Sequence, residues 1–141
     1  MADFNEINEV REQFLSVLDM LKPVLKELLE ERQMYKDCID NLKKENEIIG
    51  DNPSIDDLAT HTSNLFGITM NGMIVDRIDS KCSDILNQVY TGGRELNIDR
   101  DVVNHLIGLK ETRNDDSLDI SIDNYSVIEE IDDENNNKRG R

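Results

Sequence analysis

The stretch "INEVREQFLSVLDMLKPVLKELLEERQMYKDCIDNLKKENEII", from Ile7 to Ile49, decides the fold of this chain. Its apolar residues recur in alternating steps of three and four, the spacing that places side chains along one side of an α-helix. We therefore expect one long coiled-coil helix over residues 1–50. The seam predicted by this spacing consists of Ile7, Val10, Phe14, Val17, Leu21, Leu25, Leu28, Tyr35, Ile39, Leu42 and Ile49.

Two features interrupt the regular spacing of this seam. The step from Leu21 to Leu25 follows another step of four, which amounts to a stutter. Pro23 lies inside the stutter, and proline both lacks a backbone donor and crowds the carbonyl four residues back, so we expect a kink near Pro23 rather than a break. Arg32 and Asn46 occupy seam positions, where a polar residue either sets register and partner number or marks a place where the seam meets solvent.

The segment "GDNPS" at residues 50–54 predicts the end of the first helix and a reversal of the chain. Gly50 is a C-terminal cap, Pro53 cannot continue a helix, and Ser54 with Asp57 forms a capping box for the next one.

Beyond this turn, residues 51–113 form a helical region that is expected to pack back on the first helix. Shorter helices are predicted at residues 55–66, 69–90 and 99–110, with glycines as the stops between them. The longest of these spans only about half the length of the first helix. Half of the seam would then stay uncovered, which favours a second copy of the chain or a heteromeric coiled-coil partner.

Residues 114–141 predict a disordered acidic tail, because they contain few apolar groups that could offset the entropy of ordering. Part of this tail alternates aliphatic with acidic or polar residues, which is typical of a strand. Such a segment either docks on the sheet edge of a partner or serves only to keep the protein soluble. The tail residues that would contact a partner are Leu118, Ile120, Ile122, Val127 and Ile128.

The net charge of −15 is spread along the chain, and no segment is basic. The one basic cluster, Lys138, Arg139 and Arg141, follows an acidic run. Direct binding to a nucleic acid backbone requires clustered Lys and Arg, so we do not expect it. A basic protein surface is the candidate partner that this charge favours.

Candidate catalytic and metal-binding residues are few. His61 and His105 are the only histidines, and no nucleophile elbow or oxyanion loop accompanies them. Cys38 and Cys82 lie far apart without a Cys-x-x-Cys spacing, which argues against a zinc site. We therefore expect no enzyme, no cofactor and no metal.

A calcium loop is the remaining metal site to consider. Asp119, Ser121, Asp123 and Glu130 occupy positions 1, 3, 5 and 12 of a twelve-residue loop. Asn124 stands where such loops have glycine, so the match is poor.

The sequence contains no signal-peptide pattern and no run near 18 apolar residues, which predicts an intracellular protein of the cytoplasm, nucleus or a virion. The expected function is that of a non-enzymatic, oligomeric helical scaffold, adaptor or assembly protein, which binds a protein partner through the seam and the acidic tail. The alternative is a viral or phage acidic regulator that binds transcription or replication machinery as a nucleic-acid mimic.

Overall fold

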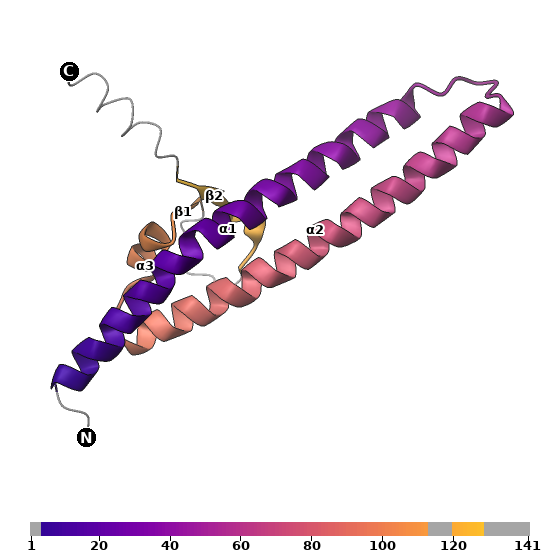
Figure 1. Ribbon diagram of the computed structural model, residues 1–141. Coiled ribbons are helices and arrows are strands. Elements are labelled where there is room, and N and C mark those ends of the chain that lie inside the picture. The colour runs from indigo at the N-terminus through magenta and orange to yellow at the C-terminus, as the bar shows by residue number, and fades with distance from the viewer. Residues whose placement is uncertain (1–3, 113–119, 129–141) are drawn as a thin grey trace, which may run out of the picture. The chain divides into compact units, whose positions relative to one another are not determined.

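The computed structural model describes residues 4–112 and 120–128 of the chain (Figure 1). Helices account for most of this part, so the predicted all-α class is confirmed, although a small sheet was not predicted. The elements are α1 (Phe4–Glu47), α2 (Ile55–Glu95), α3 (Arg100–Leu106), β1 (Leu109–Glu111), a 3-10 turn (Ile122–Asn124) and β2 (Tyr125–Val127).

Helix α1 matches the long helix that the 3-4 spacing predicts. It contains 44 residues and includes Pro23, so the proline does not end the helix. The kink near Pro23 and the supercoiling of α1 stay predictions.

Helix α2 corrects the prediction of two separate return helices. It contains 41 residues and runs without interruption through Gly67, Gly92 and Gly93. An interior glycine costs a helix only about 1 kcal/mol relative to alanine, and tertiary packing can offset that cost. The two long helices measure about 66 and 62 Å. The sequence had predicted a return helix only half as long as the first helix. That prediction was wrong, because α2 is nearly as long as α1.

The predicted capping box at the start of α2 is confirmed. The Ser54 backbone N–H donates to Asp57 Oδ2 at 3.0 Å, and the Asp57 N–H donates to Ser54 Oγ at 3.1 Å. These two bonds satisfy amide donors that the first turn of a helix leaves without an internal partner.

The chain divides into two compact units. Residues 27–84 form one unit, which we call the hairpin unit. Residues 1–26 and 85–141 form the other, which we call the terminal unit and in which the described residues are 4–26, 85–112 and 120–128.

The hairpin unit consists of two antiparallel helical segments, the second half of α1 and the first part of α2, joined by residues 48–54 (Figure 1). A Cβ placed on Gly67 would lie 2.9 Å from Leu42 Cδ1, so the glycine allows the two helices to approach closely there. Only a few side chains of this unit are buried, namely Asn64, Val75, Ile78 and Cys82. Two helices alone can bury only the single seam between them.

The terminal unit has the larger core. It combines the start of α1, the end of α2, α3 and the two strands. Phe14 packs on Gly92, where an added Cβ would lie 2.9 Å from Phe14 Cε1. Gly108, with φ +76°, makes the turn between α3 and β1 in a conformation that favours glycine. The buried apolar side chains are Leu18, Leu25, Leu86, Val89, Tyr90, Val103, Ile107, Leu109, Ile122 and Tyr125.

Strand β2 corrects the prediction of a disordered tail for residues 120–128. It pairs antiparallel with β1, in the register that sets Lys110 opposite Ser126 and Glu111 opposite Tyr125. Ile122 and Tyr125 are buried. The remaining predicted tail residues, including Leu118, lie outside the described residues.

Candidate protein-interaction surfaces

The first part of α1 carries a row of exposed apolar side chains, which we call the α1 stripe. Its members are Ile7, Val10, Val17, Met20 and Val24. Each has between 44 and 70% of its surface exposed, so together they form an apolar face on the terminal unit.

The buried face of α1 differs from the predicted seam at one position between residues 14 and 25, where Leu18 is packed in place of Val17. Leu18 is completely buried, whereas Val17 is 48% exposed. Phe14 and Leu21 are half-buried and Leu25 is buried, so the packed positions step by 4, 3 and 4 without a stutter. Val17 and Leu18 are both apolar, and spacing alone could not choose between them. Val10 and Val17 therefore lie beside the packed face of α1, and Ile7, which is in register with Phe14 and Leu21, is exposed near the start of the helix.

Four seam residues in the hairpin unit, Leu28, Tyr35, Ile39 and Leu42, are half-buried. The close approach of Leu42 to Gly67 places this part of the seam against α2 of the same chain. Ile49, also half-buried, follows the end of α1. Much of the predicted oligomerisation seam is thus used within the chain.

The two polar seam residues have partners on α2. Arg32 Nε donates to Asp79 Oδ1 at 2.5 Å, and only 12% of the Arg32 side chain is exposed. Asn64 Nδ2 donates to Asn46 Oδ1 at 3.0 Å, near the closed end of the hairpin. Such pairs fix one alignment of two helices, because a shifted alignment would separate the paired groups.

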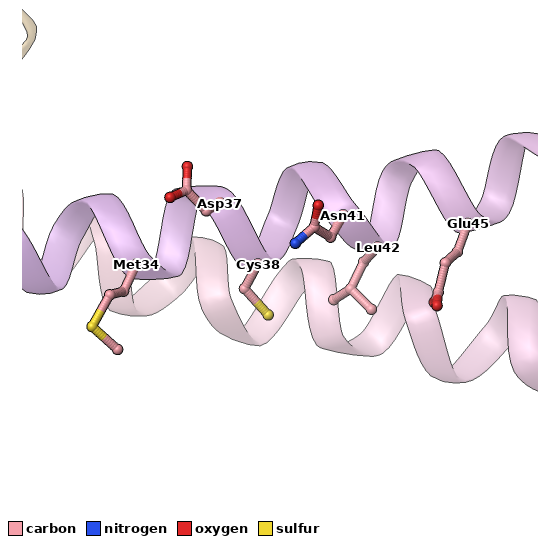
Figure 2. A pocket seen from close by; sticks show the side chains of 6 residues that line it. All are labelled: Met34, Asp37, Cys38, Asn41, Leu42 and Glu45. Carbon is pink, nitrogen blue, oxygen red and sulfur yellow. The ribbon is translucent and has the colours of Figure 1, made fainter.

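A shallow groove of about 380 Å³ runs along α1 in the hairpin unit (Figure 2). Apolar atoms of Met34, Cys38 and Leu42 line it, and polar side chains of α1 complete its wall. Cys38 Sγ accepts a hydrogen bond from Asn71 Nδ2 at 3.4 Å.

The two cysteines lie in contrasting environments. Cys38 is exposed and Cys82 is buried, and both are free thiols. Burial, with a smaller contribution from the charge of Asp79, raises the pKa of the Cys82 thiol to about 11. Cys82 therefore stays protonated and unreactive at neutral pH.

Five polar side chains, the Tyr125 cluster, join β2 to the rest of the terminal unit. The members are Tyr90, Arg100, Asn104, Glu111 and Tyr125. Arg100 binds Glu111 through Nε to Oε2 at 3.1 Å and Nη2 to Oε1 at 2.6 Å. The Tyr125 hydroxyl accepts from Arg100 Nη2 at 2.8 Å and donates to Glu111 Oε1 at 3.3 Å. This network ties the strand to α3 and β1.

The end of α2 completes the Tyr125 cluster through Tyr90. Its hydroxyl donates to Asn104 Oδ1 and lies 3.0 Å from the Tyr125 hydroxyl. The Arg100 guanidinium sits 4.4 Å above the Tyr90 ring, a cation–π arrangement. Burial raises the pKa of both tyrosine hydroxyls, so they remain protonated and act as neutral hydrogen-bonding groups. Sequence reasoning missed this cluster, because its members are spread over 36 positions of the sequence.

The predicted docking residues of the tail are placed against their own chain wherever the structure describes them. Ile122 is buried, while Ile120, Val127 and Ile128 are half-buried. Val127 lies opposite Leu109 in the sheet. Of these residues only Val127 belongs to the strand, because Ile122 begins the 3-10 turn that precedes β2.

The structure brings together no metal site within residues 4–112 and 120–128, where no three His, Cys, Asp or Glu side chains cluster. His61 is half-buried in α2 and His105 is exposed in α3. Asp119 and Glu130 of the considered calcium loop lie outside the described residues.

Comparison of this chain with protein-family models, with curated proteins and with solved structures finds no match. In the described part of the chain, no helix is both long enough and apolar enough to span a bilayer.

Proposed function

We propose that this chain is a non-enzymatic helical adaptor that binds another protein through the α1 stripe. The observation that carries the proposal is the exposure of this stripe beside the apolar face of α1 that is already packed. Val10, Val17 and Val24 are spaced by seven residues, with Met20 between the last two. Heptad spacing of apolar residues is typical of the face along which one helix packs against another.

The size of the stripe suits a reversible protein contact. Each partly exposed Val, Ile or Met that a partner covers contributes about 1 kcal/mol or more. Five such side chains can therefore support specific binding without the large apolar interface of an obligate complex.

The charges around the α1 stripe favour a basic partner. Glu9, Glu12 and Asp19 are exposed on this part of α1. The bases nearest to them are turned to the packed side, where Arg11 Nη2 donates to the Leu96 carbonyl at 2.8 Å and Lys22 lies against Gly108. An amphipathic helix flanked by Lys or Arg fits the acidic surface that these carboxylates form on α1.

The test is a substitution that places a charge in the stripe. Protein captured from the native extract by the wild-type chain is identified, purified and titrated against wild type, Val17→Asp and Met34→Asp. Met34 is 69% exposed on α1 in the hairpin unit and serves as the matched control. We expect Val17→Asp to weaken binding at least tenfold, because an unpaired carboxylate in an apolar contact is costly. Met34→Asp should bind like wild type.

The same titration at two salt concentrations tests the contribution of the exposed carboxylates of α1. Affinity should fall as salt rises, because screening weakens the attraction between exposed opposite charges. Equal binding by wild type and Val17→Asp would exclude the α1 stripe as the docking surface.

A further inference from the structure

The outer face of the two-stranded sheet carries one polar pair. Lys110 in β1 and Ser126 in β2 lie directly opposite each other, and both are exposed. Their strand neighbours Leu109 and Tyr125 are buried on the other face. Residues directly opposite in an antiparallel pair have Cβ atoms about 5 Å apart and point to the same side. The Ser126 hydroxyl is therefore open to solvent beside the Lys110 side chain.

The charge of Lys110 is not used within the described part of the chain. Glu111, the next residue, is paired with Arg100. Asp101 of α3 lines the same hollow as Lys110 but forms no ion pair with it, and neither does any other residue of 4–112 or 120–128. Lys110 is therefore available to an anion attached to Ser126.

Ser126 is followed in the sequence by a dense run of carboxylates. Residues 129–134 are "EEIDDE", so that Glu129 lies three positions beyond the serine and four more acids follow by position 134. Serine kinases that select acidic substrates bind a carboxylate at this spacing with basic side chains, and further acids add to the attraction. Such kinases bind their substrate segment in an extended conformation, which β2 has.

Two other serines have a carboxylate three positions later, and both fit this recognition less well. Ser16, followed by Asp19, lies inside α1, where the backbone is helical rather than extended. Ser54 accepts the Asp57 N–H in the capping box, and a phosphate there would face the carboxylates of Asp56 and Asp57. Of the three serines, only the one in β2 combines the acidic spacing with an extended backbone and a facing cation.

We propose that Ser126 is a phosphorylation site for an acid-directed serine kinase, and that its phosphate pairs with Lys110 across the sheet and holds β2 on β1. In the transfer, Ser126 Oγ forms a bond to the γ-phosphorus of ATP, and the bond from that phosphorus to the β–γ bridging oxygen breaks. ADP leaves with the electron pair, and the hydroxyl proton passes to a base of the kinase. The site shares no residue with the α1 stripe, so the inference stands independently of the proposed partner.

The position of Lys110 determines the direction of the effect. A phosphoserine carries a charge of about −1.5 to −2 near neutral pH. Carboxylates of its own segment, such as Asp123, repel this charge whether or not β2 is paired with β1, whereas Lys110 attracts it only in the paired state. A group that interacts differently with two states shifts the equilibrium toward the state it favours. Phosphorylation should therefore strengthen the pairing of the two strands.

The first experiment treats the full chain with an acid-directed serine kinase of the casein-kinase type, ATP and Mg²⁺, and locates the phosphate by mass spectrometry. We expect phosphate on Ser126 in this reaction and in the chain isolated from its native source. Glu129→Gln should slow the reaction at least about tenfold, whereas the matched change Glu134→Gln should slow it less than about twofold. Absence of the Ser126 phosphate from either sample, or equal rates for the two glutamine variants, would overturn the proposal.

A second experiment compares amide hydrogen exchange in the phosphorylated and unphosphorylated chains. The Ile128 N–H donates to the Gly108 carbonyl at 2.8 Å and the Thr112 N–H to the Asn124 carbonyl at 2.8 Å, so both amides report the pairing of β1 with β2. Phosphorylation should slow their exchange about threefold, the size expected for an exposed ion pair. The slowing should vanish in Lys110→Gln and shrink at high salt. Unchanged or faster exchange on phosphorylation, or equal slowing in Lys110→Gln, would overturn the proposed pairing.

Discussion

At the scale of single residues, the Tyr125 hydroxyl joins three elements of the terminal unit. It lies within hydrogen-bonding distance of Arg100, Glu111 and Tyr90, and its residue is 8% exposed. A buried network of this kind is favourable only while every member is satisfied. Removing the Tyr125 hydroxyl takes an acceptor away from Arg100 and Tyr90 in a site that water reaches poorly.

Replacing Tyr125 by Phe is therefore expected to lower the free energy of unfolding by about 1–3 kcal/mol, although the ring and its packing are retained. Urea unfolding followed by circular dichroism measures the change. Ser126→Ala is the matched control, because Ser126 is exposed in the same strand. Equal stability of Tyr125→Phe and wild type would mean that the Tyr125 cluster contributes packing only.

At the scale of elements, the long helix could be predicted because its 3-4 spacing persists over more than forty residues. The spacing did not decide which of two adjacent apolar residues, such as Val17 and Leu18, faces the core, because both fit a helical period. The continuity of α2 was missed because Gly67 and the Gly92–Gly93 pair resemble stops. Their packing against Leu42 and Phe14 in space explains why glycine occurs there within a helix.

The strand pairing could be predicted only in part. The alternation around Ile120 and Ile122 indicated a strand, but Ile122 begins a 3-10 turn and the strand starts only at Tyr125. Its partner β1 was missed because Leu109 and Lys110 were assigned to the end of a helix predicted at residues 99–110. The Tyr125 cluster could not be predicted, because local spacing carries no information about which distant residues meet.

The glycines of α2 provide a test at this scale. A Cβ on Gly72 would meet nothing within 4 Å, so Gly72→Ala should raise the free energy of unfolding by about 0.5–1 kcal/mol through helix propensity. A Cβ on Gly93 would lie 2.9 Å from Val103 Cγ2 and 3.1 Å from the Ile98 carbonyl oxygen. Gly93→Ala should therefore destabilise by about 1–3 kcal/mol. Thermal melts at one protein concentration compare the two, and a stabilising Gly93→Ala would contradict the packing described here.

At the scale of the whole molecule, the terminal unit is assembled from segments far apart in the sequence. Its core includes Leu18 and Leu25 near the start of the chain and Ile122 and Tyr125 from the segment 120–128. The sequence alone had predicted that this segment contributes little to stability. The burial of Ile122 and Tyr125 leads to the opposite expectation.

A chain that ends at Thr112 should accordingly be less stable than one that ends at Ile128, by roughly 2–5 kcal/mol, because the shorter chain lacks both buried side chains. Comparing these two truncations isolates the contribution of residues 113–128. Unfolding in urea, followed by circular dichroism, gives the difference. Identical transitions for the two chains would show that the docking of β2 adds no stability.

The division into two units also sets an order for events on the ribosome. Residues 27–84 are contiguous, so the hairpin can form as soon as α2 has been translated that far. The start of α1 is synthesised first, but its packed face is covered only after residues 85–128 have been synthesised. Until then Phe14, Leu18 and Leu25 remain accessible to chaperones on the nascent polypeptide. A premature stop codon between positions 112 and 122 would therefore release a chain whose hairpin is complete but whose terminal core is still open, a natural substrate for quality-control proteases.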